Sequence, residues 1–183
     1  MLTFAVYVQD HPGVLNRVSS LFRRRALNIE SLTVGATERD DISRMTIVVD
    51  APETARGRIE ANLYKLLEVE RVEFIPSGSS VHRDLALIKV AATHASRSGI
   101  MQLVDVFRAR VVDVAPDSLV VEITGTEDKI DGLLDVLKPY GLIEMVRTGR
   151  VAMTRGAEIR ATDAKGQPGS VPVTADDNVS YSV

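Results

Sequence analysis

The chain has 183 residues, enough for one ordinary domain or two small ones, and its 45% hydrophobic and 26% charged content is typical of a soluble globular protein. A net charge of −3 with 4% aromatic residues gives no general reason to expect binding to nucleic acid or to an anionic membrane. The absence of cysteine excludes disulfides, thiol catalysis and thiolate metal sites. No apolar run approaches the roughly 20 residues that span a bilayer, and the amino terminus does not resemble a signal peptide, so we expect a cytoplasmic protein.

The first half predicts the order strand, helix, strand, strand, helix, strand from the periods of its apolar residues. The predicted ranges in chain order are 2–9, 13–26, 29–37, 43–50, a helix that follows Pro52, and 69–75. We expect the buried stripe of the second helix to be Ile59, Leu63, Leu66 and Leu67. The small polar run 76–80 then marks a domain boundary.

The second half predicts the same element order, offset by roughly 80 residues. Its ranges are a strand over 85–93, a helix after Ser98, strands over 111–114 and 119–124, a helix after Thr126, and a strand over 141–153. The predicted class is therefore α+β, with two ferredoxin-like βαββαβ domains, each an antiparallel sheet with helices on one face. We place these domains at 1–77 and 78–156, followed by a polar segment over 157–183 that we predict to be disordered.

The junction Asp10-His11-Pro12-Gly13 lies between the first predicted strand and the first predicted helix. A helix that begins directly after a strand leaves its first backbone N–H groups without partners, and these groups attract anions. Gly13 has no Cβ, which lets a ligand approach the backbone closely. The junction is therefore either a socket for a small anion such as a carboxylate or only a tight turn.

Further runs give the chain a family resemblance. They are Asp10-His11-Pro12-Gly13-Val14-Leu15-Asn16-Arg17, Asn28-Ile29-Glu30-Ser31-Leu32, Ser43-Arg44-Met45-Thr46-Ile47, Ala86-Leu87-Ile88-Lys89-Val90 and Val151-Ala152-Met153-Thr154-Arg155-Gly156. Over roughly residues 1–156 the chain resembles the regulatory small subunit of acetolactate synthase, also called acetohydroxyacid synthase, which begins with an ACT domain. The resemblance implies an amino-terminal ACT domain and a second, ACT-like domain.

The resemblance also implies a function. It implies a non-catalytic subunit that activates a separate catalytic (large) subunit and makes it sensitive to valine or a related branched-chain amino acid. Thiamine diphosphate, Mg and FAD are expected in that partner, and no cofactor in this chain. ACT domains usually pair side by side, which implies a homodimer with the effector between two copies. The implied effector-binding residues are Asp10, Gly13, Val14, Leu15, Asn28 and Ile29, of which Asn28 and Ile29 complete the pocket from the neighbouring subunit.

Several of these residues also have simpler interpretations. Asp10 either contacts the ammonium group of an effector or only caps the helix. Asn28 either binds the effector through its amide or is a left-handed residue at the helix exit. The run Arg23-Arg24-Arg25 either solvates the helix end, where cations are favourable, or meets an acidic partner.

Other classes of function fit the residues less well. The three histidines His11, His82 and His94 lack metal-ligand spacing, and no nucleophile or phosphate-loop motif is present. An acylphosphatase has the same element order and a first loop whose arginine grips phosphate, but here Asp10 would repel phosphate and Arg17 comes a full helical turn after Gly13. An RNA-binding sheet needs exposed aromatic residues in a motif that is absent. The alternative that remains is an ACT-type sensor that serves another enzyme or a transcriptional regulator.

Overall fold

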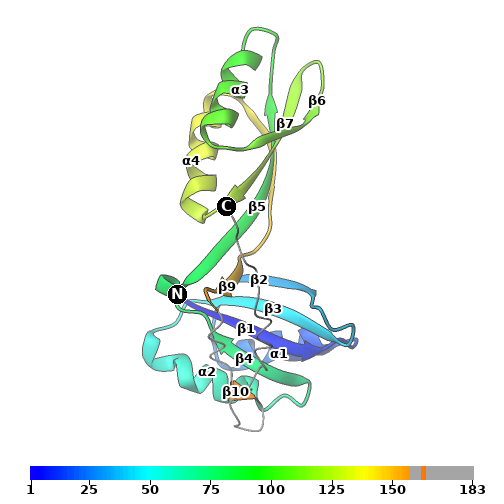
Figure 1. Ribbon diagram of the computed structural model, residues 1–183, viewed down its shortest axis with the longest axis vertical. Helices are drawn as coiled ribbons and strands as arrows, with labels where there is room; N and C mark the ends of the chain where they lie inside the picture. The colour runs from blue at the N-terminus through cyan, green and yellow to red at the C-terminus, as the bar shows by residue number, and fades with distance from the viewer. Residues whose placement is uncertain (157–161, 164–183) are drawn as a thin grey trace, which may run out of the picture.

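A computed structural model describes residues 1–156 and 162–163 of the chain. Figure 1 shows two domains stacked along the long axis, with the amino-terminal domain below and the second domain above. Each domain has its own hydrophobic core, and the two cores share no residue.

The first domain is a four-stranded sheet covered by two helices, and a short fifth strand extends the sheet. Its elements are β1 (Leu2–Gln9), α1 (Val14–Arg24), β2 (Ile29–Ala36), β3 (Ile42–Val49), α2 (Arg56–Leu63, after a 3₁₀ turn at Glu53–Ala55), β4 (Val69–Phe74) and β10 (Thr162–Asp163). The sheet order is β10-β4-β1-β3-β2, and every recorded pair is antiparallel. Strand β2 is therefore an edge strand.

The second domain repeats this arrangement. Its elements are β5 (Ser80–Ala91, after a 3₁₀ turn at Ser77–Ser79), α3 (Arg97–Val106), β6 (Arg110–Val114), β7 (Ser118–Gly125), α4 (Glu127–Leu137, with a 3₁₀ turn at Lys138–Tyr140), β8 (Leu142–Arg147) and β9 (Val151–Thr154). The sheet order β6-β7-β5-β8 matches β2-β3-β1-β4 element by element. The chain even adopts a left-handed conformation at equivalent places, Ala26 after α1 and Arg108 after α3.

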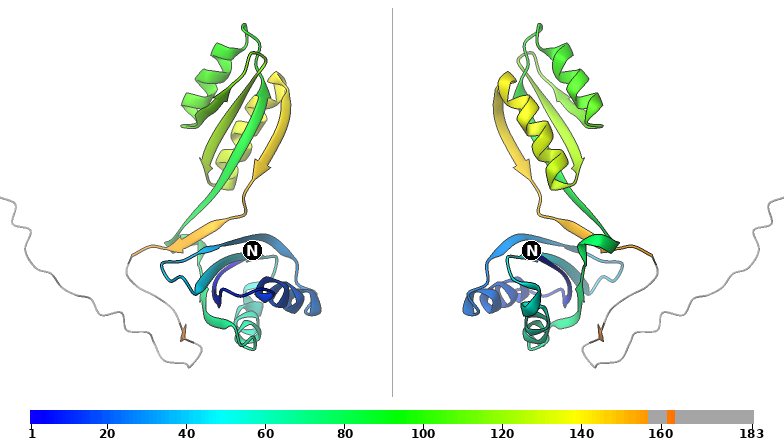
Figure 2. Two further views of the ribbon diagram at one scale, coloured as in Figure 1. Left: turned by 90° about the vertical axis from the view of Figure 1, so that its right-hand side faces the viewer. Right: turned by 90° about the vertical axis from the view of Figure 1, so that its left-hand side faces the viewer.

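These topologies confirm the predicted α+β class with two ferredoxin-like βαββαβ domains. In each domain the two helices cover one face of the sheet, as the two side views in Figure 2 show. The first core is made by alternate residues of β1, such as Phe4 and Val6, packed against Val18 and Phe22 of α1. The alternation in strands and the apolar stripe in helices are thus what the fold buries.

Two predicted strands are wrong in their extent. The strand predicted at 85–93 is β5, which spans Ser80–Ala91 and so begins at the end of the predicted boundary run 76–80, although the boundary itself stays a prediction. Its first four residues pair with β9, and its remainder pairs with β7 and β8. The strand predicted at 141–153 is broken into β8 and β9 by residues 148–150, because there the chain leaves the second sheet and passes over the first.

The antiparallel pair formed by β9 and the start of β5 covers the face of the first sheet that the helices leave open. Ala152 of β9 packs with Ala5, Tyr7 and Ile75 in a small third cluster. Arg44 of β3 donates to the carbonyl oxygen of Ala152 at 2.5 Å. The side views in Figure 2 show this pair of strands lying between the first sheet and the second domain.

The predicted burial of Leu67 is also wrong, because this side chain is 92% exposed. Helix α2 ends at Leu63, and the next residues form tight turns in which Leu66 N–H donates to Leu63 and Val69 N–H donates to Leu66. The helical period therefore no longer applies at Leu67. Of the segment 157–183 that we predicted to be disordered, the structure describes only Thr162–Asp163, which form β10, and the rest of that prediction lies outside the described residues.

Candidate functional site

The junction between β1 and α1 is shaped by Gly13, the N-cap of the helix. Its φ of 92° lies in the left-handed region that residues with a Cβ rarely adopt. A Cβ built at this position would meet no atom within 4 Å, so the space in front of the backbone is open. The first turn of α1 contains no acidic residue, and no side chain caps it.

The amides at this helix start are available to an anion. Val14 N–H donates to the carbonyl of His11 at a long 3.4 Å, and within the described chain the amides of Gly13 and Leu15 donate no backbone hydrogen bond. The loop before them is held in place, because Asp10 N–H donates to the carbonyl of Asp41 at 2.9 Å. Unpaired amides on a fixed, exposed helix start are suited to binding a carboxylate.

Two charged residues near this junction have defined roles. Arg17 pairs with the carboxylate of Glu68, whose side chain is only 10% exposed, and so it ties α1 to the start of β4. An arginine held in this way is not directed at a ligand in the loop, which argues against an acylphosphatase. Asp10 does not cap α1 with its side chain, so the simpler interpretation of Asp10 is wrong.

Asn28 and Ile29 lie where the chain enters β2. The left-handed residue after α1 is Ala26, with φ of 52°, and not Asn28, so the simpler interpretation of Asn28 is wrong as well. Asn28 is exposed and its side-chain amide donates to the carboxylate of Glu30. Ile29 is half-buried against the first core.

A single chain does not bring these two groups of residues together. Strands β1 and β2 are both antiparallel to β3, so they run in the same direction. The junction after Gln9 lies at the end of the sheet where Ala36 pairs with Ser43, whereas Ile29 lies at the other end, opposite Val49. Eight strand residues, about 25 Å, separate the ends.

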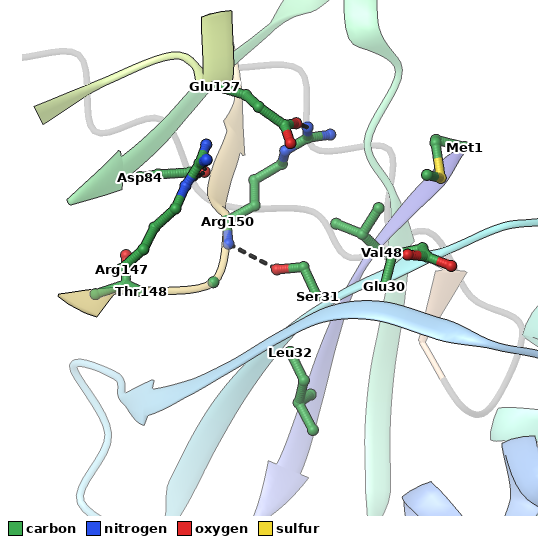
Figure 3. A pocket seen from close by; sticks show the side chains of 11 residues that line it. Met1, Glu30, Ser31, Leu32, Val48, Asp84, Glu127, Arg147, Thr148 and Arg150 are labelled. Carbon is green, nitrogen blue, oxygen red and sulfur yellow. Dashed lines mark hydrogen bonds and ion pairs between the residues drawn. The ribbon is translucent and has the colours of Figure 1, made fainter. Parts of the chain in front are cut away.

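Residues that the sequence analysis did not select line a polar pocket of about 480 Å³ between the two domains (Figure 3). The first domain contributes Met1, Glu30, Ser31, Leu32 and Val48, and the second contributes Asp84, Glu127, Arg147, Thr148, Gly149 and Arg150. No local period or motif marks this set, because it exists only once the two domains are stacked.

Ion pairs hold the pocket wall on the second-domain side. Arg147 bonds to Asp84 at 2.8 Å and to Asp131 at 3.0 Å, and Arg150 pairs with Glu127 at 3.3 Å. Although burial of Arg147 lowers its pKa, the hydrogen bond and the charge of Asp84 outweigh this effect and raise the pKa above its ordinary value. Arg147 and Arg150 are therefore committed to carboxylates of β5 and α4.

The run Arg23-Arg24-Arg25 is exposed at the end of α1, and Arg24 and Arg25 line a groove against α2. Among the residues that the structure describes, no ion pair is recorded for these three arginines. Their position fits favourable placement of cations at a helix end, and an acidic partner stays a prediction. In the described part of the chain, no helix has the length and apolar character needed to cross a membrane.

Both parts of the chain match known protein families. Residues 4–71 match the family described as "AHAS small subunit-like ACT domain", and residues 83–156 match "Small subunit of acetolactate synthase". The chain belongs to the acetolactate synthase small-subunit family. The resemblance drawn from the sequence is thereby confirmed, and the ACT domain together with the small-subunit match supports a regulatory role.

Relatives and a solved structure agree with this assignment. The chain is 52% identical to the probable acetolactate synthase small subunit of Archaeoglobus fulgidus over 84% of this chain and 96% of that protein. It is 50% identical to the acetolactate synthase small subunit of Mycolicibacterium smegmatis, over 84% and 91% of the two chains. The crystal structure of the acetolactate synthase small subunit from Thermotoga maritima superimposes with a TM-score of 0.81 at 37% identity, covering 85% of this chain and 97% of that one.

Proposed function

We propose that this small subunit acts in branched-chain amino acid biosynthesis by regulating a separate acetolactate synthase catalytic subunit. It binds and activates that subunit, which carries thiamine diphosphate, Mg and FAD, and it performs no catalysis itself. Valine or a related branched-chain amino acid binds the ACT domain and inhibits the complex. Such inhibition is a coupling between two sites, typically ~1–3 kcal/mol.

The observation that carries the proposal is the geometry of the edge strand β2. Its outer edge pairs with no strand in the described chain, and an unpaired edge favours addition of another strand. If two copies join through antiparallel β2 strands, the start of one β2 lies beside the end of the other. The junction at Gly13 then meets Asn28 and Ile29 of the partner subunit, which one chain alone keeps apart.

Exposed apolar residues support the same dimer. Leu15 in the first turn of α1 is 45% exposed, and Val34 near the end of β2 is 43% exposed. Val34 lies on the same strand face as Leu32, which packs on the core beneath the helices. A partner chain at the β2 edge would cover both side chains beside the open amides.

In this dimer the chemistry of a free amino acid is matched group by group. The amides of Gly13, Val14 and Leu15 bind the carboxylate. The side-chain oxygen of Asn28 of the partner subunit accepts from the ammonium group, and Asp10 adds a negative charge near it. Ile29 and Leu15 offer apolar contact to an aliphatic side chain.

A mixing experiment tests the shared site. Gly13→Asp and Asn28→Ala should each weaken effector binding in their homodimers, measured by calorimetric titration with valine, leucine and isoleucine at concentrations where only the intact site binds. In a mixed dimer both changes fall in one site and leave the other site intact, so each mixed dimer should bind half as much effector as a wild-type dimer, while both parental homodimers bind none. If mixing restores nothing although dimers exchange, the site is not shared between chains.

A second candidate is an ACT-type sensor that serves another enzyme or a transcriptional regulator. The second domain argues for the synthase, because residues 83–156 match the small subunit and not only an ACT domain. Co-purification with the catalytic subunit and its activation would decide between the two. A chain that binds a branched-chain amino acid but neither binds nor activates that subunit would favour the second candidate.

A further inference from the structure

The segment Thr148-Gly149-Arg150 connects β8 to β9 and is attached to both domains. Thr148 N–H donates to the carbonyl of Leu85 at 2.9 Å, and Arg150 and the preceding Arg147 are paired with carboxylates of α4 and β5. On the other side the segment lies on β2 of the ACT domain (Figure 3). We call residues 148–150 the crossing segment.

The contact with β2 is close and specific. The amide of Arg150 donates to the hydroxyl of Ser31 at 2.8 Å. A Cβ added to Gly149 would lie 2.6 Å from Thr33 Oγ1, 2.7 Å from Ser31 Oγ and 2.9 Å from the carbonyl oxygen of Leu32. One of these three atoms is backbone, so the strand itself would have to move. Only glycine fits here because a Cβ would collide with β2. Backbone conformation is not the reason, since the φ of Gly149 lies outside the left-handed region.

This contact lies next to the proposed effector site. Ser31 follows Asn28 by three residues, about 10 Å along a strand. Between them the pairing of β2 with β3 shifts register at Ile29 and Ser31, and such a bulge redirects the side chains around it. Glu30, at this irregularity, accepts from Asn28 and also lines the interdomain pocket. Glu30 thus links Asn28 to the residues under the crossing segment.

One polar group at the contact has no partner. Thr33 Oγ1 is buried and makes no hydrogen bond within the described structure. A buried hydroxyl without a partner costs free energy, so the observed arrangement is not the one that satisfies every polar group here. A displacement of the crossing segment relative to β2 would therefore cost this hydroxyl no hydrogen bond.

We propose that the crossing segment, seated on Ser31 and Thr33, couples effector occupancy at Asn28 to the orientation of the second domain. The inference rests on the proposed function. The effector changes the start of β2, β2 displaces the crossing segment, and the ion pairs of Arg147 and Arg150 carry the displacement to β5 and α4. Gly149 and Ser31 are positioning residues and do not touch the effector.

Gly149→Ala tests the coupling, with Gly78→Ala as its matched control. Both glycines lie on connections between the domains, but a Cβ at Gly78 would meet nothing within 4 Å. In the isolated chain, Gly149→Ala should leave the effector affinity near the wild-type value. In the complex with the catalytic subunit, the change in activity caused by the effector, typically ~5–150-fold for such couplings, should fall toward onefold. Gly78→Ala should behave as wild type.

Ser31→Ala provides a second test that keeps the fold intact, because it removes one hydroxyl and adds no volume. It should weaken the coupling in the same direction. A structural readout comes from spin labels at Arg58→Cys in α2 and Gln102→Cys in α3, both exposed, in a chain that has no cysteine of its own. The distance between the labels, measured in chains diluted with unlabelled protein, should shift with valine in the wild type and not in Gly149→Ala.

The outcomes separate the two proposals. Full effector inhibition in both Gly149→Ala and Ser31→Ala, or an unchanged label shift in Gly149→Ala, would overturn the coupling and leave the proposed function standing. A wild-type chain that binds no branched-chain amino acid, or does not activate the catalytic subunit, would overturn the proposed function and the coupling with it.

Discussion

Replacing Gly13 by Asp combines two effects that the structure allows one to separate. Any residue with a Cβ is strained at a φ of 92°, at a cost to folding of about 1–3 kcal/mol. Asp also places a carboxylate where the effector's carboxylate is expected. Two like charges about 4 Å apart repel by about 1 kcal/mol in bulk water and about 4 kcal/mol near a protein surface. The repulsion therefore predicts effector binding weaker by about 5-fold to about 1000-fold.

Gly13→Asn is the matched control, because Asn has nearly the same shape, tolerates positive φ about as well as Asp, and carries no charge. Both variants should unfold at similar urea concentrations, below wild type, since they share the strain. Calorimetric titration with valine, leucine and isoleucine should show the large loss only for Asp. Activation of the catalytic subunit should persist in both. Equal effector affinity in the two variants would refute the placement of the carboxylate at this helix start.

Three further predictions concern stability. Arg147→Met leaves a buried carboxylate on β5 without its partner and should lower the free energy of unfolding by about 3 kcal/mol in urea melts, whereas Lys138→Met, in an exposed pair, should change it by less than about 1 kcal/mol. Leu63→Ala should cost about 2–5 kcal/mol, and Leu67→Ala should stay within about 0.5 kcal/mol; similar losses would contradict the burial described above. Burial, followed by the charge of Arg150, lowers the pKa of His82. As the pH falls through the ordinary histidine pKa of 6.5, the unfolded chain binds a proton at His82 before the folded chain does, so the free energy of unfolding should fall. His82→Gln should flatten this dependence of the free energy of unfolding on pH between about pH 7.5 and about pH 5.5. An unchanged slope in this variant would contradict the lowered pKa of His82.

The fold could be predicted from the sequence because its strands and helices follow from the spacing of apolar residues that are neighbours in the chain. Alternation in β1 and the stripe of α1 are properties of neighbouring residues, and their repeat after roughly 80 residues implied a second domain of the same order. The loop at Gly13 was likewise visible, because a strand followed at once by a helix has a known backbone consequence. The burial of Leu67 was misjudged because the stripe continued in sequence after the helix had ended.

The interdomain contacts could not be predicted in this way. Nothing local distinguishes Gly149 from any glycine in a polar loop, and its importance arises from the approach of Ser31 and Thr33, more than a hundred residues earlier. The break of the predicted strand at 141–153 has the same cause. For the proposed effector site, the sequence supplied the residues, while the strand directions showed that Gly13 and Asn28 lie at opposite ends of one sheet.

The passage of one strand, β5, through both halves of the molecule has a consequence for dissecting it. A fragment ending at residue 77 would lack Ala152, so Ala5 and Ile75 would face water and Arg44 would lose its carbonyl acceptor. Such a fragment should therefore precipitate or melt early, while a protein that keeps residues 80–83 and 151–154 together with the first domain should remain intact. The two halves should accordingly unfold in one cooperative transition, as a single thermodynamic unit with two architectures of the same kind.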